Sequence, residues 1–175
     1  AWKELADREG IPFDRSVNNR LRGVSRMESL EILLERAKRS YSQEEKEKMA
    51  AAKNTRYQEL LREMTPADLS PEVFETLETL RKQGLKLAIG SSSKNTPLIL
   101  DRLGLGGYFD AVSDGNNITR SKPDPEVFLK AAEYLGLSPE TCLVVEDAVS
   151  GVEAAHRAGM KAAALGDAAK TGVGE

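Results

Sequence analysis

After residue 65 the sequence alternates between segments with helical spacing and short apolar runs, and this alternation restricts the fold more than any other feature. The apolar runs lie at 85–91, 109–114, 141–147 and 160–166. Continuous apolar runs of this length, separated by helices, predict parallel strands that are buried on both faces. Because crossover connections are right-handed, these strands and helices are expected to form a doubly wound α/β layer structure with a parallel sheet.

The first third of the chain has a different composition. Residues 1–64 hold one of the seven prolines and two of the fourteen glycines, which predicts long helices with few turns. Ser25 and Ser42 each precede a glutamate by three residues, the spacing of a capping box, so a helix is expected to start at each. We therefore predict an all-α helical cap at 1–64, a proline-containing linker at 65–71 and the α/β core at 72–175.

Polar side chains follow three of the apolar runs. The first run ends in Ser-Ser-Ser-Lys-Asn at 91–95, the loop after the second contains Lys122, and the third ends at Glu146 and Asp147. In doubly wound folds ligands bind outside the carboxyl ends of the strands, so these groups are expected to converge. Mg²⁺ prefers one or two carboxylates with phosphate oxygens, and lysine and hydroxyl groups suit the other oxygens. The pattern predicts a phosphate site with a divalent cation.

Each of these residues also has a plainer interpretation. Ser91 could satisfy a backbone amide at a strand end, Lys122 could be a solvated loop residue, and Asp147 could cap the helix that follows it. Their occurrence at one edge of the same sheet favours the phosphate site.

Composition argues against several other classes of protein. The net charge of −3 and the pI of about 5.5 argue against nucleic-acid binding, which usually needs a basic surplus. No run approaches the roughly 18 apolar residues of a membrane span, and a single cysteine cannot form an internal disulfide. We expect a cytoplasmic, monomeric protein with a small-molecule ligand.

Three stretches of the core resemble a known family. The segments LAIGSSSKN, SKPDPEVF and VVEDAVSGVEAAHRAG are similar to the second, third and fourth motifs of the haloacid dehalogenase superfamily, and LRGVSRMESL and AAKNTRYQELL resemble the cap of its β-phosphoglucomutase branch. The resemblance implies an α/β core with a helical cap. It also implies the interconversion of β-glucose 1-phosphate and glucose 6-phosphate through a phosphoaspartate and a bisphosphate intermediate, with Mg²⁺.

The resemblance also implies roles for the residues at the strand ends. Ser91 would hydrogen-bond the phosphoryl group in transfer, and Lys122 would neutralise charge on that group and on the nucleophile. Asp147 would bind Mg²⁺ directly, with Glu146 beside it either as a second ligand or as a supporting acid.

Substrate-binding residues are implied on both sides of the cleft. In the cap, Arg26 would hold the phosphate that is not being transferred. Five further residues would contact the sugar or its distal phosphate: Lys53 and Asn54 in the cap, and Ser93, Lys94 and Asn95 in the core.

One motif of the superfamily is missing. The aspartate nucleophile and the acid/base aspartate form a D-x-D pair after the first strand, and no D-x-D occurs in the 175 residues. We expect that strand upstream, or from another chain, in a central slot between 85–91 and 141–147. Two alternatives stay open: a phosphatase of the same superfamily that acts on a small sugar phosphate or other phosphomonoester, and an inactive fragment.

Overall fold

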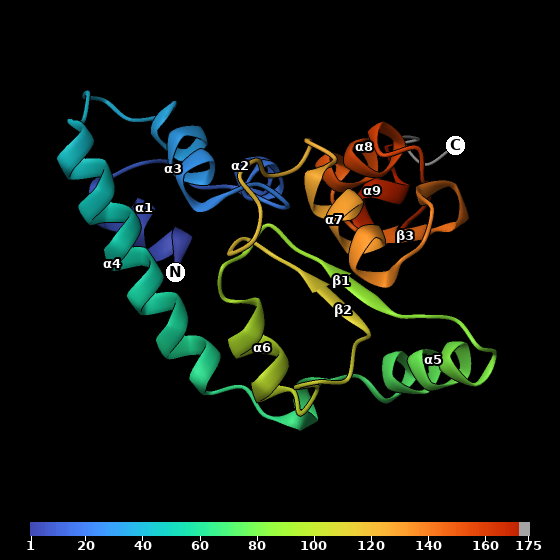
Figure 1. Cartoon of the computed structure of the whole chain (residues 1–175). Coiled ribbons are helices and arrows are strands. Elements are labelled where there is room, and N and C mark those ends of the chain that lie inside the picture. The colour runs from blue at the N-terminus through green and yellow to red at the C-terminus, as the bar shows by residue number, and fades with distance from the viewer. Residues whose placement is uncertain (172–175) are drawn as a thin grey trace.

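The computed structural model describes residues 1–171, and its first four helices gather on one side of the molecule (Figure 1). These are α1 (Trp2–Glu9), α2 (Arg15–Arg20), α3 (Arg26–Leu34) and α4 (Gln43–Arg62). The prediction of long helices is correct only for α4, because α1, α2 and α3 have eight, six and nine residues. The short α2 was not predicted from the sequence, and the helix that starts after Ser25 ends at Leu34.

Both predicted capping boxes are present. The hydroxyl of Ser25 accepts from the N–H of Glu28, whose carboxylate accepts from the N–H of Ser25. Ser42 and Glu45 make the same reciprocal pair at the start of α4. Each box satisfies two backbone N–H groups that have no partner inside the helix, which fixes the starting residue.

The four helices enclose an apolar core of their own. Leu30 and Leu33 from α3 and Val17 from α2 are fully buried there, and Met49 from α4 and Leu5 from α1 pack with them. Burying such side chains contributes about 1.5–3 kcal/mol each relative to exposure, so short helices are stable here through packing with one another.

The remainder of the described chain alternates helices with short parallel strands. The helices are α5 (Pro71–Lys82), α6 (Thr96–Arg102), α7 (Glu126–Leu135), α8 (Val149–Arg157) and α9 (Gly166–Ala169), and the strands are β1 (Ala88–Gly90), β2 (Ala111–Ser113), β3 (Leu143–Glu146) and β4 (Lys161–Ala164). Each strand lies inside an apolar run identified from the sequence. The predicted linker contains a short 3₁₀ turn at Pro66–Asp68, and α5 already begins at Pro71.

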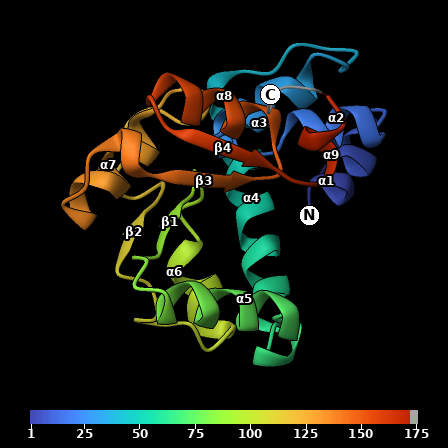
Figure 2. The same ribbon diagram turned by 90° about the vertical axis from the view of Figure 1, so that its right-hand side faces the viewer.

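The strands form two separate parallel pairs, β1 with β2 and β3 with β4 (Figure 2). In the described residues β1 and β3 are not paired, as expected if a further strand belongs between them. The prediction that every strand is buried on both faces is wrong for β3, because Leu143 and Val145 are 62% and 60% exposed. Val144, whose side chain points to the opposite face, is buried, so β3 is covered on one face only.

No helix among the described residues has both the length and the apolar character needed to cross a membrane.

Candidate active site

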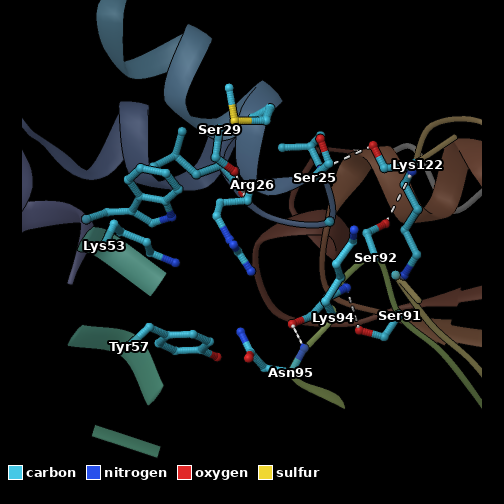
Figure 3. Close-up of a pocket in the computed structure, with 18 of the residues that line it drawn as sticks. Ser25, Arg26, Ser29, Lys53, Tyr57, Ser91, Ser92, Lys94, Asn95 and Lys122 are labelled. Carbon is cyan, nitrogen blue, oxygen red and sulfur yellow. Dashed lines mark hydrogen bonds between the residues drawn. The ribbon is translucent and has the colours of Figure 1, made fainter. Parts of the chain in front are cut away.

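A cavity of about 940 Å³ lies between the helical side of the molecule and the strand ends (Figure 3). Its lining combines residues from α1, α3 and α4 with residues from the loops after β1 and β2 and from the end of β3. The structure brings eight of the predicted site residues to this lining: Arg26, Lys53, Ser91, Ser93, Lys94, Asn95, Lys122 and Glu146. Asn54 and Asp147 do not line it.

The loop after β1 is shaped by its own hydroxyl groups. The hydroxyl of Ser91 accepts from the N–H of Ser93, and the hydroxyl of Ser93 accepts from the N–H of Asn95. These side chains bond to the backbone two residues on, which holds a tight turn at the strand end. Gly115 lies very close to the backbone of this loop, and a Cβ at Gly115 would stand 2.6 Å from the carbonyl oxygen of Ser92. The close backbone approach therefore requires glycine there.

Lys122 is held rigidly at the centre of the core wall. Its ammonium donates to Glu146 Oε2 at 2.6 Å and to the carbonyl oxygen of Gly90 at 3.0 Å, and it lies over the ring of Phe128. Both side chains of the ion pair are nearly inaccessible, with 5% and 10% exposed for Lys122 and Glu146. A buried pair with supporting hydrogen bonds fixes both groups in one position.

The acidic pair at the end of β3 divides into two different environments. Besides its contact with Lys122, Glu146 accepts through Oε1 from the N–H groups of Asp147 and Ala148. Asp147 is exposed, and its only charged partner in the described structure is the guanidinium of Arg22 at 3.3 Å. Both carboxylate oxygens of Glu146 therefore already have partners within the protein.

The residues present fit a magnesium site in a limited sense. Among residues 1–171 no three His, Cys, Asp or Glu side chains lie close enough to enclose a metal ion. Mg²⁺ does not require such an enclosure, because it keeps several waters and binds through one or two carboxylates and phosphate oxygens. The accessible carboxylate of Asp147 suits this kind of binding.

The cap wall presents two cations without acidic partners. Neither the side chain of Arg26 nor that of Lys53 makes a hydrogen bond or an ion pair with another described residue, and both point into the cavity (Figure 3). Burial lowers the pKa of Arg26. Burial, with the nearby charge of Arg26, lowers the pKa of Lys53 to about 8. Half-buried cations that have no carboxylate partner are chemically suited to an anion.

Asn54 lies beside the cavity and contacts the core directly. Its side-chain oxygen accepts from the side-chain amide of Asn95 at 2.9 Å, and Gln58 donates to Asn95 at 3.0 Å. Asn54 therefore positions Asn95 in this conformation. We expected Asn54 to contact the ligand, but its side chain does not line the cavity.

Sequence reasoning missed several residues that line the cavity or contact the site. Trp2 and Tyr57 flank Lys53, and Ser121 bonds to the capping box of α3 through the N–H of Ser25. Tyr57 could have been found, because residues four apart on a helix are neighbours and Tyr57 follows Lys53 by four. The contact of Trp2 with Lys53 is long-range and leaves no local signal.

The sequence matches a known protein family over most of its length. Residues 1–159 match the family model described as a haloacid dehalogenase-like hydrolase. The chain belongs to this family. The resemblance of its three core motifs is thereby confirmed.

Two curated relatives are similar over most of the chain. The chain is 42% identical to the beta-phosphoglucomutase of Bacillus subtilis over 168 residues, which cover 95% of this chain and 74% of that protein. It is 35% identical to the phosphorylated carbohydrates phosphatase of Thermotoga maritima, with 92% of this chain and 73% of that protein covered.

Among solved structures, the beta-phosphoglucomutase of Clostridium difficile superimposes with a TM-score of 0.87 at 38% identity. The match covers 94% of this chain and 75% of that one.

Proposed function

We propose that this chain, together with a strand that carries the aspartate nucleophile, is a phosphotransferase that interconverts β-glucose 1-phosphate and glucose 6-phosphate, and that the 175 residues alone are inactive. The observation that carries the proposal is the pair of walls around the cavity. The core wall presents the hydroxyl groups of the loop after β1 and the fixed ammonium of Lys122, and the cap wall presents Arg26 and Lys53 without partners. A bisphosphate intermediate needs a grip for each phosphate, and the two walls supply one each.

On the core wall the proposed steps depend on charge and position. Ser91 donates a hydrogen bond to the phosphoryl group in transfer, and Lys122 offsets its negative charge from a position that Glu146 and Gly90 hold constant. Groups that are already oriented when charge develops are effective because they need no reorganisation during the reaction. Phosphoryl transfer is chiefly a matter of such positioning and charge neutralisation.

Asp147 is the residue proposed to hold Mg²⁺, with Glu146 supporting it through Lys122 and the backbone. When bound, the ion would supply positive charge to the phosphate oxygens. The contact of Arg22 with Oδ2 of Asp147, at 3.3 Å, would weaken when the ion binds, because the two positive charges repel one another.

The carboxylate nucleophile is proposed to come from a D-x-D strand that inserts between β1 and β3. The separate strand pairs support this, because β1 and β3 are not paired in the described residues and a parallel strand between them would join both pairs into one sheet. The strand could belong to the same polypeptide or be added by a second chain. In either case its carboxyl end would lie next to Ser91, Lys122 and Asp147.

Substitutions in the cap can distinguish this reaction from the phosphatase alternative, which the Thermotoga maritima relative motivates. In protein that carries the D-x-D strand, Arg26→Ala should lower mutase turnover about tenfold or more, since a charge-assisted contact is worth roughly 1.5–3 kcal/mol. Hydrolysis of a small phosphomonoester should change little. Arg20→Ala is the matched control, because Arg20 pairs with Glu35 on the cap surface. Equal losses on both substrates would support the phosphatase.

The third alternative, a protein that binds sugar phosphates but transfers nothing, has its own test. If the D-x-D strand is supplied and no phosphoryl transfer to it is detected by mass spectrometry, the chain is a binding module.

A further inference from the structure

Lys53 is held in the cap wall by two aromatic rings. Its ammonium nitrogen lies 4.5 Å from the ring centroid of Trp2 on α1 and 4.4 Å from that of Tyr57 on α4. Both distances are within the range in which a cation is attracted to the face of a ring. In the described structure the side chain of Lys53 has no carboxylate partner and makes no hydrogen bond, and its burial lowers its pKa to about 8.

Aromatic partners and carboxylate partners leave a lysine in different states. A carboxylate neutralises the ammonium and occupies its N–H groups, as Glu146 does for Lys122. A ring attracts the positive charge through its quadrupole but carries no net charge, so the cation keeps its full charge and its N–H groups stay free. Tyr57 is a neutral ring at neutral pH, because a tyrosine hydroxyl ordinarily has a pKa near 10 and burial raises the pKa of this one further.

The other charged groups that face this part of the cavity are also cations. Arg26 comes from α3, Lys3 from α1 and Lys94 from the loop after β1. The single acidic side chain in the described lining is Glu146, which is already paired with Lys122. Nothing anionic in the lining therefore competes with a ligand for Lys53.

We propose that Trp2 and Tyr57 are positioning residues that aim the unpaired ammonium of Lys53 into the cavity, where it and Arg26 receive an anionic group of the phosphate class. The identity of that group as the second phosphate of a sugar bisphosphate rests on the proposed function. The positioning of Lys53 by the two rings rests on the geometry alone.

The first experiment measures Lys53 without any ligand. In protein labelled with ¹³C at lysine Cε, the Lys53 resonance should titrate near pH 8 and be assigned by its loss in Lys53→Met. Tyr57→Leu and Trp2→Leu keep apolar bulk but remove the ring, so each should lower this midpoint. Tyr57→Phe keeps the ring face and should leave it unchanged. If Tyr57→Leu and Tyr57→Phe both leave the midpoint at the wild-type value, the positioning role is wrong.

The second experiment measures binding of glucose 1,6-bisphosphate by calorimetry. Tyr57→Leu should weaken binding about three- to tenfold, as expected for a partly desolvated cation–π contact, and Tyr57→Phe should bind within about twofold of the wild type. In a Lys53→Met background Tyr57→Leu should have no further effect. A ring that merely supported the helix would weaken binding in that background too, and this result would overturn the proposal.

The two experiments test separately the positioning of Lys53 by the rings and the identity of the anionic group. If wild-type protein that carries the D-x-D strand does not bind the bisphosphate, the proposed reaction is wrong, while the titration of Lys53 still decides the role of the rings. Thermal unfolding of each variant, measured in the same buffer, identifies any variant that loses binding because it does not fold.

Discussion

The cap wall and the core wall of the cavity each present a lysine, and the two lysines are held by different kinds of partner. Lys122 donates to a carboxylate and a backbone carbonyl and is buried, whereas Lys53 lies between two rings and is half-buried. The first arrangement fixes a charge where the chemistry needs constant geometry. The second keeps a charge available for a ligand that arrives and leaves.

The difference also has a thermodynamic side. A buried ion pair is costly to break, because removal of one member leaves the other charged and without a partner. A half-buried lysine without a carboxylate partner already carries such an uncompensated charge in the wild-type protein, so its removal should raise the free energy of unfolding. Substitution of Lys122 and substitution of Lys53 should therefore change the free energy of unfolding in opposite directions.

The largest effect is expected for Lys122→Met. Glu146 would keep its buried carboxylate without the ammonium, which should lower the free energy of unfolding by about 3–5 kcal/mol. Urea denaturation measures this change. The control is Lys46→Met, which breaks the surface pair with Glu31 and should cost less than about 1 kcal/mol. Partial recovery in the Lys122→Met, Glu146→Gln double variant is expected. A loss as small as that of the control would contradict the buried-pair account.

A smaller effect is expected when Glu146 is displaced without loss of either charge. A Cβ at Gly151 on α8 would overlap the Glu146 carboxylate, so Gly151→Ala should lower the free energy of unfolding by about 1–3 kcal/mol, less the gain from alanine in a helix. Gly106→Ala is the control, because the nearest atom, Asp101 Oδ1, is 3.9 Å from the new methyl group. If Gly151→Ala costs as much in a Glu146→Ala background, the clash is not with Glu146.

Lys53→Met should raise stability at pH 7. The pKa of Lys53 is lowered from 10.5 to about 8 in the folded state, so the folded protein disfavours the charged form. That penalty is fully present below pH 8 and is relieved between pH 8 and 10.5, where the folded state releases its proton before the unfolded state does. We expect a gain of about 1–2 kcal/mol at pH 7, after allowance for partial solvent screening, that fades toward pH 10. A gain independent of pH would exclude titration of Lys53 as its cause.

These predictions depend on contacts that the sequence reveals unequally. The capping boxes at Ser25 and Ser42 were predictable, because all their atoms lie within four residues and each bond satisfies a backbone group of the same helix. The strand positions were predictable for a similar reason, since each strand corresponds to a continuous apolar run.

The rest depends on distant parts of the chain. Lys122 and Glu146 were both identified from the sequence, but their pairing was not, because it joins the loop after β2 to the end of β3. In the described residues the strands divide into two pairs because none lies between β1 and β3, and the exposure of Leu143 reflects an uncovered face of β3. The short α2 was missed because its N-cap, Asp14, has no glutamate three residues later to complete a box.

The smallest effect concerns movement of one wall relative to the other. Arg15 on α2 pairs with Asp167 on α9 at 2.9 Å, and Arg22 lies 4.0 Å from the same carboxylate. Because this contact joins the cap helices to the C-terminal part of the core, we expect it to help hold the cavity closed, while the linker at 65–71 acts as the hinge. The positive charge of Arg15 lowers the pKa of Asp167. The contact should therefore persist at neutral pH and weaken only in acid, as Asp167 takes up a proton.

Both side chains reach solvent, so added salt should screen the pair, and the radius of gyration from small-angle scattering should rise slightly between about 0.05 M and about 0.5 M salt. Arg15→Gln should show the high-salt value at low salt. Lys48→Gln removes an equivalent charge from a pair within α4 and should change nothing. The exchange of charges in Arg15→Asp with Asp167→Arg should restore the compact form only in part, because the new arginine would lie close to Arg22 and Lys170. If the radius of gyration changes neither with salt nor in Arg15→Gln, the two walls are held together by other contacts, such as the Asn54–Asn95 hydrogen bond.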